Sequence, residues 1–136
     1  MKSFLLFSLL FLLLLSCKKE STLFTALTSN ETNIDFRNNI ENSKNLNILN
    51  YLYFYNGAGV ASGDFNNDGL ADLYFVSNQF SDKLYLNLGD FRFKDITKRS
   101  GIKNDVPWTT GVTTVDVNSD GLLDIYVCKI GKHLSI

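Results

Sequence analysis

Asp64-Phe65-Asn66-Asn67-Asp68-Gly69-Leu70-Ala71-Asp72 places side-chain oxygens at positions 1, 3, 5 and 9 of one short segment. Ca²⁺ prefers about six to eight oxygen ligands, and a loop curled round it presents alternate side chains and one backbone carbonyl. The candidate side-chain ligands are Asp64, Asn66, Asp68 and Asp72, and the candidate carbonyl ligand is Leu70. Gly69, at position 6, permits the sharp turn that such a loop requires. The spacing therefore predicts a calcium-binding loop.

The residues on either side of this loop predict strands rather than helices. An EF-hand needs a bidentate Glu at position 12 and a helix on each side, but position 12 is Phe75. The flanks, residues 59–63 and 73–76, are rich in glycine and in β-branched and aromatic residues, which favour strands. The predicted unit is a strand, a calcium loop and a second strand.

A second copy of the unit begins 52 residues later. When residues 59–76 are aligned with residues 111–128, 9 of 18 positions are identical, including every proposed side-chain ligand. The corresponding candidate ligands are Asp116, Asn118, Asp120, Leu122 and Asp124. Asn-Asp-Gly and Ser-Asp-Gly are also hairpin turn signals, which is the alternative interpretation. Turn chemistry explains Asp-Gly but does not explain an Asp at positions 1 and 9.

The N-terminus predicts an exported lipoprotein. Lys2 precedes an apolar run from Phe4 to Leu15, which is too short to span a membrane core of about 30 Å as a helix. The ending Leu14-Leu15-Ser16-Cys17 resembles the lipobox of bacterial lipoproteins, so residues 1–16 are interpreted as a signal peptide and Cys17 as the lipidated residue. The alternatives are an ordinary cleaved signal and an uncleaved anchor, and each also exports the chain. The expected location is the bacterial outer membrane or cell surface.

The rest of the chain divides into a tether and a β region. Residues 17–33 are expected to form the lipidated N-terminus and tether, and residues 34–136 the repeat region. Residues 30–50 contain eight asparagines, which favours irregular structure, with a helix over residues 39–49 as the alternative. If Cys17 is lipidated, Cys128 has no disulfide partner and is expected to be a small buried hydrophobic residue in a strand.

The strand pattern predicts an all-β fold, namely a partial β-propeller of about one and a half four-stranded blades with strand–calcium loop–strand repeats. Predicted strands cover residues 50–55, 59–63, 71–76, 83–87 and 91–96, and the first blade covers about residues 51–98. An incomplete second blade, at about residues 106–136, supplies strands at 111–117 and 123–128. Because a blade buries its faces only against neighbouring blades, we expect either a fragment or self-association through open blade edges.

The stretch from Gly59 to Tyr74, together with Leu84-Tyr85-Leu86-Asn87 and Phe93-Lys94-Asp95-Ile96-Thr97, resembles the FG-GAP/VCBS repeats of integrin α-subunit propellers and bacterial surface proteins. It looks most like secreted proteins related to cartilage acidic protein, which carry a C-terminal ASPIC/UnbV domain that this sequence lacks. The resemblance covers about residues 34–129 and implies a calcium-stapled β-propeller whose loops serve in recognition.

Three functions follow from these observations as hypotheses. The first is a non-enzymatic, calcium-dependent surface module for adhesion or for binding an extracellular protein or glycan. The second is a fragment of a calcium-dependent enzyme acting on polysaccharides, and the third is a non-functional truncated product. The formal charge of −1 gives no basic surface for nucleic acid.

Few residues outside the loops carry a functional interpretation. The sequence contains no Gly-x-Ser-x-Gly nucleophile motif. Its one histidine, His133, is expected to be a solvent-exposed residue rather than a general base. Trp108 is a candidate for stacking on a ligand, but it is expected first to be a core residue, and Tyr74 and Tyr126 are expected to pack between blades.

Overall fold

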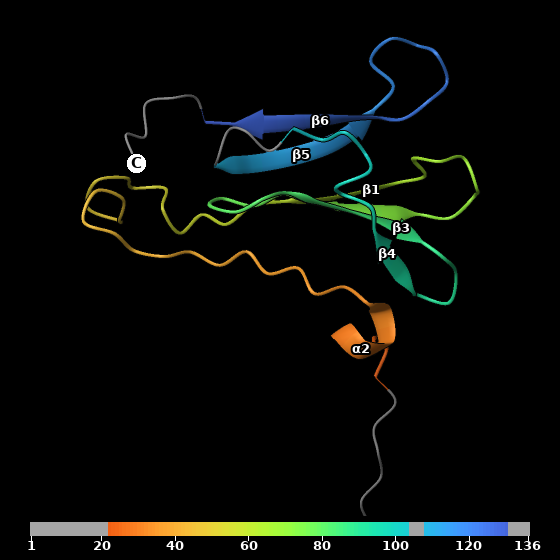
Figure 1. Ribbon diagram of the computed structural model, residues 1–136, viewed down its shortest axis with the longest axis horizontal. Helices are drawn as coiled ribbons and strands as arrows, with labels where there is room; N and C mark the ends of the chain where they lie inside the picture. Colours follow the sequence, from red (N-terminus) through yellow and green to blue (C-terminus); the bar gives the residue numbers. More distant parts are fainter. Residues whose placement is uncertain (1–21, 104–107, 131–136) are drawn as a thin grey trace, which may run out of the picture.

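The computed structural model describes residues 22–103 and 108–130, which form two antiparallel sheets and one short helix. The elements are α2 (Ser29–Thr32), β1 (Val60–Gly63), β2 (Asp72–Phe75), β3 (Lys83–Asn87), β4 (Phe93–Asp95), β5 (Thr109–Val115) and β6 (Asp124–Lys129). The strand order is β1-β2-β3-β4 in the first sheet and β5-β6 in the second, which lies beside β1 (Figure 1). The all-β class is confirmed, and the two sheets correspond to one four-stranded blade and half of another.

The 52-residue sequence repeat is also a repeat of strand register. In the first sheet Val60 pairs with Phe75 and Gly63 with Asp72. In the second sheet Val112 pairs with Val127 and Val115 with Asp124, and these are the same pairs moved by 52 residues. Because register decides which side chains face the core, both copies present equivalent positions to each side of their sheets.

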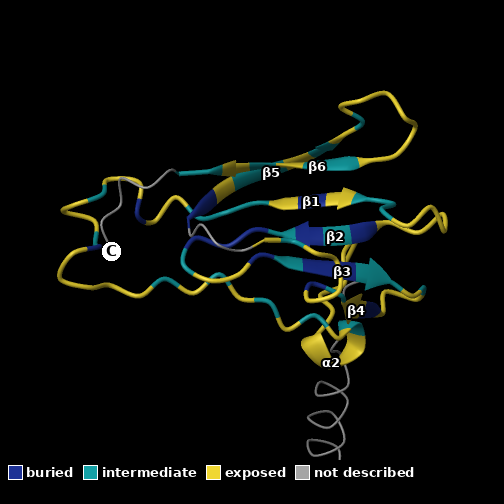
Figure 2. Ribbon diagram, turned by 45° about the horizontal axis from the view of Figure 1, so that its top comes forward, coloured by how far each residue is buried: buried dark blue, intermediate teal, exposed yellow. Residues whose placement is uncertain are grey.

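The main core lies between the two sheets. Tyr74, Val76 and Leu84 are buried there, and they pack against Val112, Ile125 and Val127 of the second sheet (Figure 2). A hydroxyl contact supports the same packing, since Thr114 Oγ1 donates to the carbonyl of Ser62 at 3.3 Å. Full burial of each large apolar side chain stabilises the fold by roughly 1.5–3 kcal/mol. The packing role predicted for Tyr74 is therefore confirmed.

The predicted strand at residues 50–55 is wrong, because this segment forms consecutive turns. The amide of Tyr51 donates to the carbonyl of Asn47 at 2.9 Å. The amide of Phe54 donates to the carbonyl of Tyr51 at 3.0 Å. Phe54 is thereby buried with Trp108 and Leu46 in a second apolar cluster. Local aromatic content favoured a strand, but the turns bury only the Phe54 ring and leave Leu52, Tyr53 and Tyr55 exposed. The core role expected of Trp108 is confirmed, since the residue is 1% exposed.

Other parts of the predicted first blade also differ. The strand predicted over residues 91–96 is β4, which is shorter, because Asp90 and Phe91 adopt positive φ angles in the turn before it. Residues 39–49 form no helix; residues 39–43 are irregular, and bends and turns follow over residues 44–50. The helix α2 was not expected. It is a single turn capped by Thr28 and Glu31, where Thr28 N donates to Glu31 Oε2 at 2.7 Å.

The predictions for Cys128 and Tyr126 are wrong, because both side chains are exposed. Side chains alternate between the two faces of a strand. Val127 and Ile125 face the first sheet, so Tyr126 and Cys128 point to the opposite face of β6. No sheet covers that face among the described residues. Cys17 and His133 lie outside the described residues.

Candidate metal-binding loops

The two aspartate-rich loops connect β1 to β2 and β5 to β6, and they extend from the same end of the two sheets (Figure 1). In the first loop, the Asp64 carboxylate accepts the amide of Asp68 at 3.1 Å and that of Gly69 at 2.8 Å. Asn66 Oδ1 also accepts the Asp68 amide at 3.1 Å, and Asp68 Oδ1 accepts the Leu70 amide at 2.8 Å. Backbone N–H groups thus hold the oxygens at positions 1, 3 and 5 around one turn.

The second loop reproduces the same network. The Asp116 carboxylate accepts the amides of Asp120 at 3.1 Å and Gly121 at 2.8 Å, and Asn118 Oδ1 accepts the Asp120 amide at 3.1 Å. The amide of Leu122 donates to Asp120 Oδ1 at 2.8 Å. Two independent stretches of sequence therefore adopt one loop conformation.

Left-handed backbone at two positions makes this conformation accessible. Asn67 and Ser119 have φ angles of 59° and 61°, and Gly69 and Gly121 have φ angles of 83° and 86°. Glycine adopts positive φ without the steric penalty of a Cβ atom, and Asn tolerates it better than most residues. The glycine at position 6 is thus required by the turn whether or not a metal binds.

Hydrogen bonding also favours the charged form of one loop carboxylate. The backbone N–H of Leu122 and then the side-chain amide of Asn118 lower the pKa of Asp120, against a weaker opposing effect of burial. Asn118 Nδ2 donates to Asp120 Oδ2 at 2.9 Å, as Asn66 Nδ2 donates to Asp68 Oδ2 at 2.8 Å. An ionised carboxylate is the state in which aspartate binds a cation.

The aspartate at position 9 is placed differently from the others. Asp72 is fully buried, and its two oxygens accept the Phe65 amide at 3.0 Å and the Asn87 amide at 2.8 Å. Asp72 therefore joins the base of the loop to β3. Asp124 also accepts an amide from the second residue of its loop, that of Val117 at 3.0 Å. It is only half-buried, because it pairs with Val115 of β5 on one side and no described strand lies on its other side, where β3 lies in the first sheet.

The donor set of each loop suits Ca²⁺ in kind, because it consists of carboxylate and amide oxygens. The structure brings positions 1, 3 and 5 together around the amide of Asp68 or Asp120. It leaves position 9 at the base of the loop. Within residues 22–103 and 108–130, no three His, Cys, Asp or Glu side chains form a cluster placed for a metal ion.

The same part of the chain contains no helix long and apolar enough to cross a membrane.

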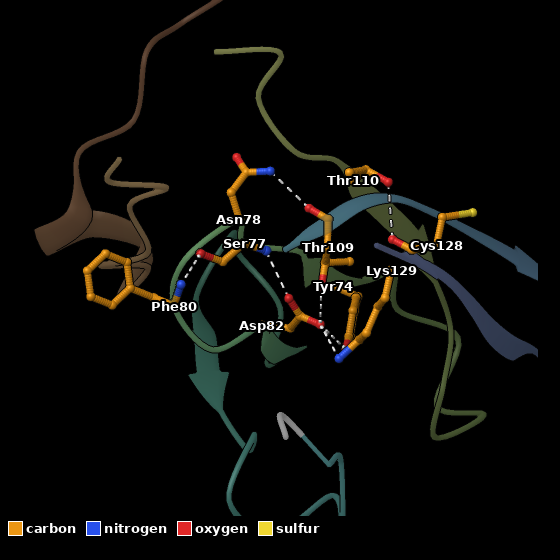
Figure 3. A network of polar contacts seen from close by, with 9 residues as sticks. All are labelled: Tyr74, Ser77, Asn78, Phe80, Asp82, Thr109, Thr110, Cys128 and Lys129. Atoms are coloured by element: carbon orange, nitrogen blue, oxygen red, sulfur yellow. Dashed lines mark hydrogen bonds and ion pairs between the residues drawn. The ribbon is translucent and has the colours of Figure 1, made fainter. Parts of the chain in front are cut away.

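A buried polar network at the other end of β2 was missed by sequence reasoning. Asp82 is 1% exposed, and it accepts hydrogen bonds from the Ser77 amide at 2.8 Å, the Tyr74 hydroxyl at 3.2 Å and the Thr109 hydroxyl at 3.2 Å (Figure 3). Lys129 Nζ lies 3.7 Å from Asp82 Oδ2. These partners come from both sheets, so Asp82 connects the two repeats. A polar loop sequence carries no signal that one of its carboxylates is buried.

These features define a class of protein: an antiparallel β-repeat protein with one aspartate-rich hairpin loop per repeat. Residues 64–127 match the FG-GAP-like repeat family, and this region of the chain is an FG-GAP-like repeat. The match begins at the first ligand candidate and ends in β6, so it includes both loops. Neither the curated proteins nor the solved structures contain a significant match to the chain.

Proposed function

We propose that this chain is an exported, lipid-anchored FG-GAP repeat module that binds calcium and recognises an extracellular protein or glycan at the cell surface. The observation that carries the proposal is the identical hydrogen-bond network of the two loops. The proposed ligands are the carboxylates and amides at positions 1, 3, 5 and 9 and the carbonyls of Leu70 and Leu122.

Calcium would supply charge compensation and cross-linking in this module. Each loop carries three aspartates within nine residues, and their mutual repulsion opposes folding when no cation is present. A cation bound only by the folded state stabilises it by mass action. The residues themselves contribute a turn already closed by N–H groups. Binding requires in addition that the position 9 carboxylate and the loop oxygens face a common centre, with Asp72 keeping its bonds to the Phe65 and Asn87 amides.

Thermal unfolding followed by circular dichroism tests the calcium sites. We expect calcium to raise the unfolding midpoint of the parent chain relative to chelator, and not to raise that of an Asp68→Asn/Asp120→Asn variant. Asparagine keeps an oxygen that can accept the amide of Leu70 or Leu122, so the loop turn is retained while one negative charge per loop is removed. An equal calcium response in the parent and the variant would refute the assignment.

The lipid anchor requires its own test. The Cys17 thiol is the proposed attachment point, and Cys17→Ser is the matched variant. We expect the parent expressed in a bacterial host to incorporate radiolabelled palmitate and to sediment with membranes, and the variant to do neither. Palmitate incorporation that persists in the Cys17→Ser variant would contradict the assignment.

A further inference from the structure

An open cleft lies between the segment that precedes β1 and the loop that joins β2 to β3. It has a volume of about 360 Å³ and is lined by Asp35, Phe36, Arg37, Phe80, Ser81 and Lys83. Ligand sites for small molecules typically measure about 300–1,000 Å³, so the cleft can hold one or two sugar rings. The loop of the cleft follows β2, whereas the first aspartate-rich loop precedes it. The cleft is therefore separate from the metal-binding loops.

One wall of the cleft is rigid because of the Asp82 network. The Ser77 amide is held by Asp82, and the Ser77 hydroxyl oxygen accepts the Phe80 amide at 3.2 Å. Figure 3 shows the Phe80 ring pointing away from this network. Phe80 as a residue is 50% exposed, although its backbone amide is held by Ser77. An aromatic ring presented to solvent from a fixed loop loses little conformational entropy when it binds a ligand.

The opposite wall is held against the first sheet. The Tyr85 hydroxyl donates to Asp35 Oδ1 at 2.7 Å, and the Phe36 ring stacks on Phe75 with centroids 4.9 Å apart. Asn38 then ties the two walls together, because its Nδ2 donates to Asn78 Oδ1 at 2.7 Å and its Oδ1 accepts the Asn78 amide at 3.0 Å. Both sides of the cleft are therefore preorganised.

The charged groups of the cleft differ in how far they are already engaged. Lys83 Nζ contacts Asp95 Oδ2 at 2.7 Å, and Asp35 accepts the Tyr85 hydroxyl. Arg37 is exposed and makes neither a hydrogen bond nor an ion pair with any residue the structure describes. A guanidinium group binds a carboxylate through two parallel hydrogen bonds, a geometry that lysine cannot provide.

We propose that this cleft binds a saccharide that carries a carboxylate, such as a uronic acid, with the sugar ring against Phe80 and its carboxylate on Arg37. Aromatic rings offer an apolar face to the C–H groups of a sugar, while the hydroxyl groups remain hydrated or contact Ser81. The inference rests on the proposed recognition function and specifies its ligand class.

Isothermal titration of the full chain with cellobiouronic acid and with its neutral counterpart, cellobiose, tests the proposal. The test variants are Arg37→Gln and Phe80→Ala. The matched controls are Arg92→Gln and Phe91→Ala, which change an exposed arginine and an exposed phenylalanine of the turn before β4, outside the cleft. Thermal unfolding of each variant verifies that it is folded.

The parent should bind the acidic disaccharide at least about 10-fold more tightly than the neutral one, since a hydrogen bond to a charged group is worth more than a neutral one. Arg37→Gln should abolish this preference, and Phe80→Ala should weaken both ligands by about 10-fold. Equal affinity of the parent for the two sugars, no binding of either, or an equal loss in the controls would overturn the proposal. A chain that calcium stabilises but that binds neither sugar would leave the surface-module proposal intact and refute only the cleft.

Discussion

Replacement of Asp72 by asparagine should destabilise the protein far more than the same change at Asp124, although both residues occupy position 9 of a loop. Asp72 is fully buried and accepts two backbone N–H groups, at 3.0 Å from Phe65 and 2.8 Å from Asn87. Asparagine offers one acceptor oxygen and turns an NH₂ group toward the second N–H. The variant therefore loses one charge-assisted hydrogen bond and leaves a buried donor without an acceptor.

The magnitude follows from these two losses. A hydrogen bond to a charged group contributes about 1.5–3 kcal/mol, and a buried unsatisfied group costs about 1–3 kcal/mol. Asp72→Asn should therefore lower the free energy of unfolding by roughly 2.5–6 kcal/mol, which is a large fraction of the usual ~5–15 kcal/mol. Asp124 is half-buried and accepts one amide, that of Val117, so Asp124→Asn should cost about 1 kcal/mol or less.

Urea unfolding in the presence of chelator measures both variants without any contribution from metal. If position 9 were important only as a metal ligand, the two substitutions would have small and equal effects under these conditions. A difference below about 1 kcal/mol between the two variants would therefore refute the argument from buried hydrogen bonds. A larger loss for Asp124→Asn than for Asp72→Asn would refute it more strongly.

Three further outcomes are expected. Burial, followed by the charge and hydrogen bond of Asp82, raises the pKa of Tyr74, and burial followed by the Asp35 hydrogen bond raises that of Tyr85. The stability that these two raised pKa values contribute is fully present below pH ~10, the pKa of tyrosine in the unfolded chain, and is lost as the pH rises above it. Ultraviolet titration should show Tyr74 and Tyr85 ionising only as the chain unfolds. Asp82→Asn should lower the free energy of unfolding by about 2–4 kcal/mol in urea, because it weakens a buried network that joins both sheets, whereas an effect below ~0.5 kcal/mol would contradict that role. The exposed Cys128 thiol should be alkylated in the native protein at a rate close to that in denaturant, as measured by mass spectrometry on the Cys17→Ser variant.

The local features of this protein were predicted from sequence because they depend on neighbouring residues. The nine-residue spacing, the glycine at position 6 and the 52-residue offset predicted two like calcium-binding loops. The hydrogen bonds of Asp64 and Asp116 confirm that the two loops have the same conformation, and calcium binding stays a prediction. The all-β class was predicted for the same reason, since periodicity and turn residues lie within a few positions of each strand.

Only the tertiary structure separated residues whose local sequences are alike. Asp72 and Asp124 occupy equal positions in their repeats, but β3 covers Asp72 and no described strand covers Asp124. Tyr74 and Tyr126 differ in the same way, with exposures of 2% and 59%. The burial of Asp82 depends on Thr109, which lies 27 residues away. Burial and hydrogen-bond satisfaction are set by residues distant in the chain. A local sequence pattern contains no information about which distant residue packs against a given position.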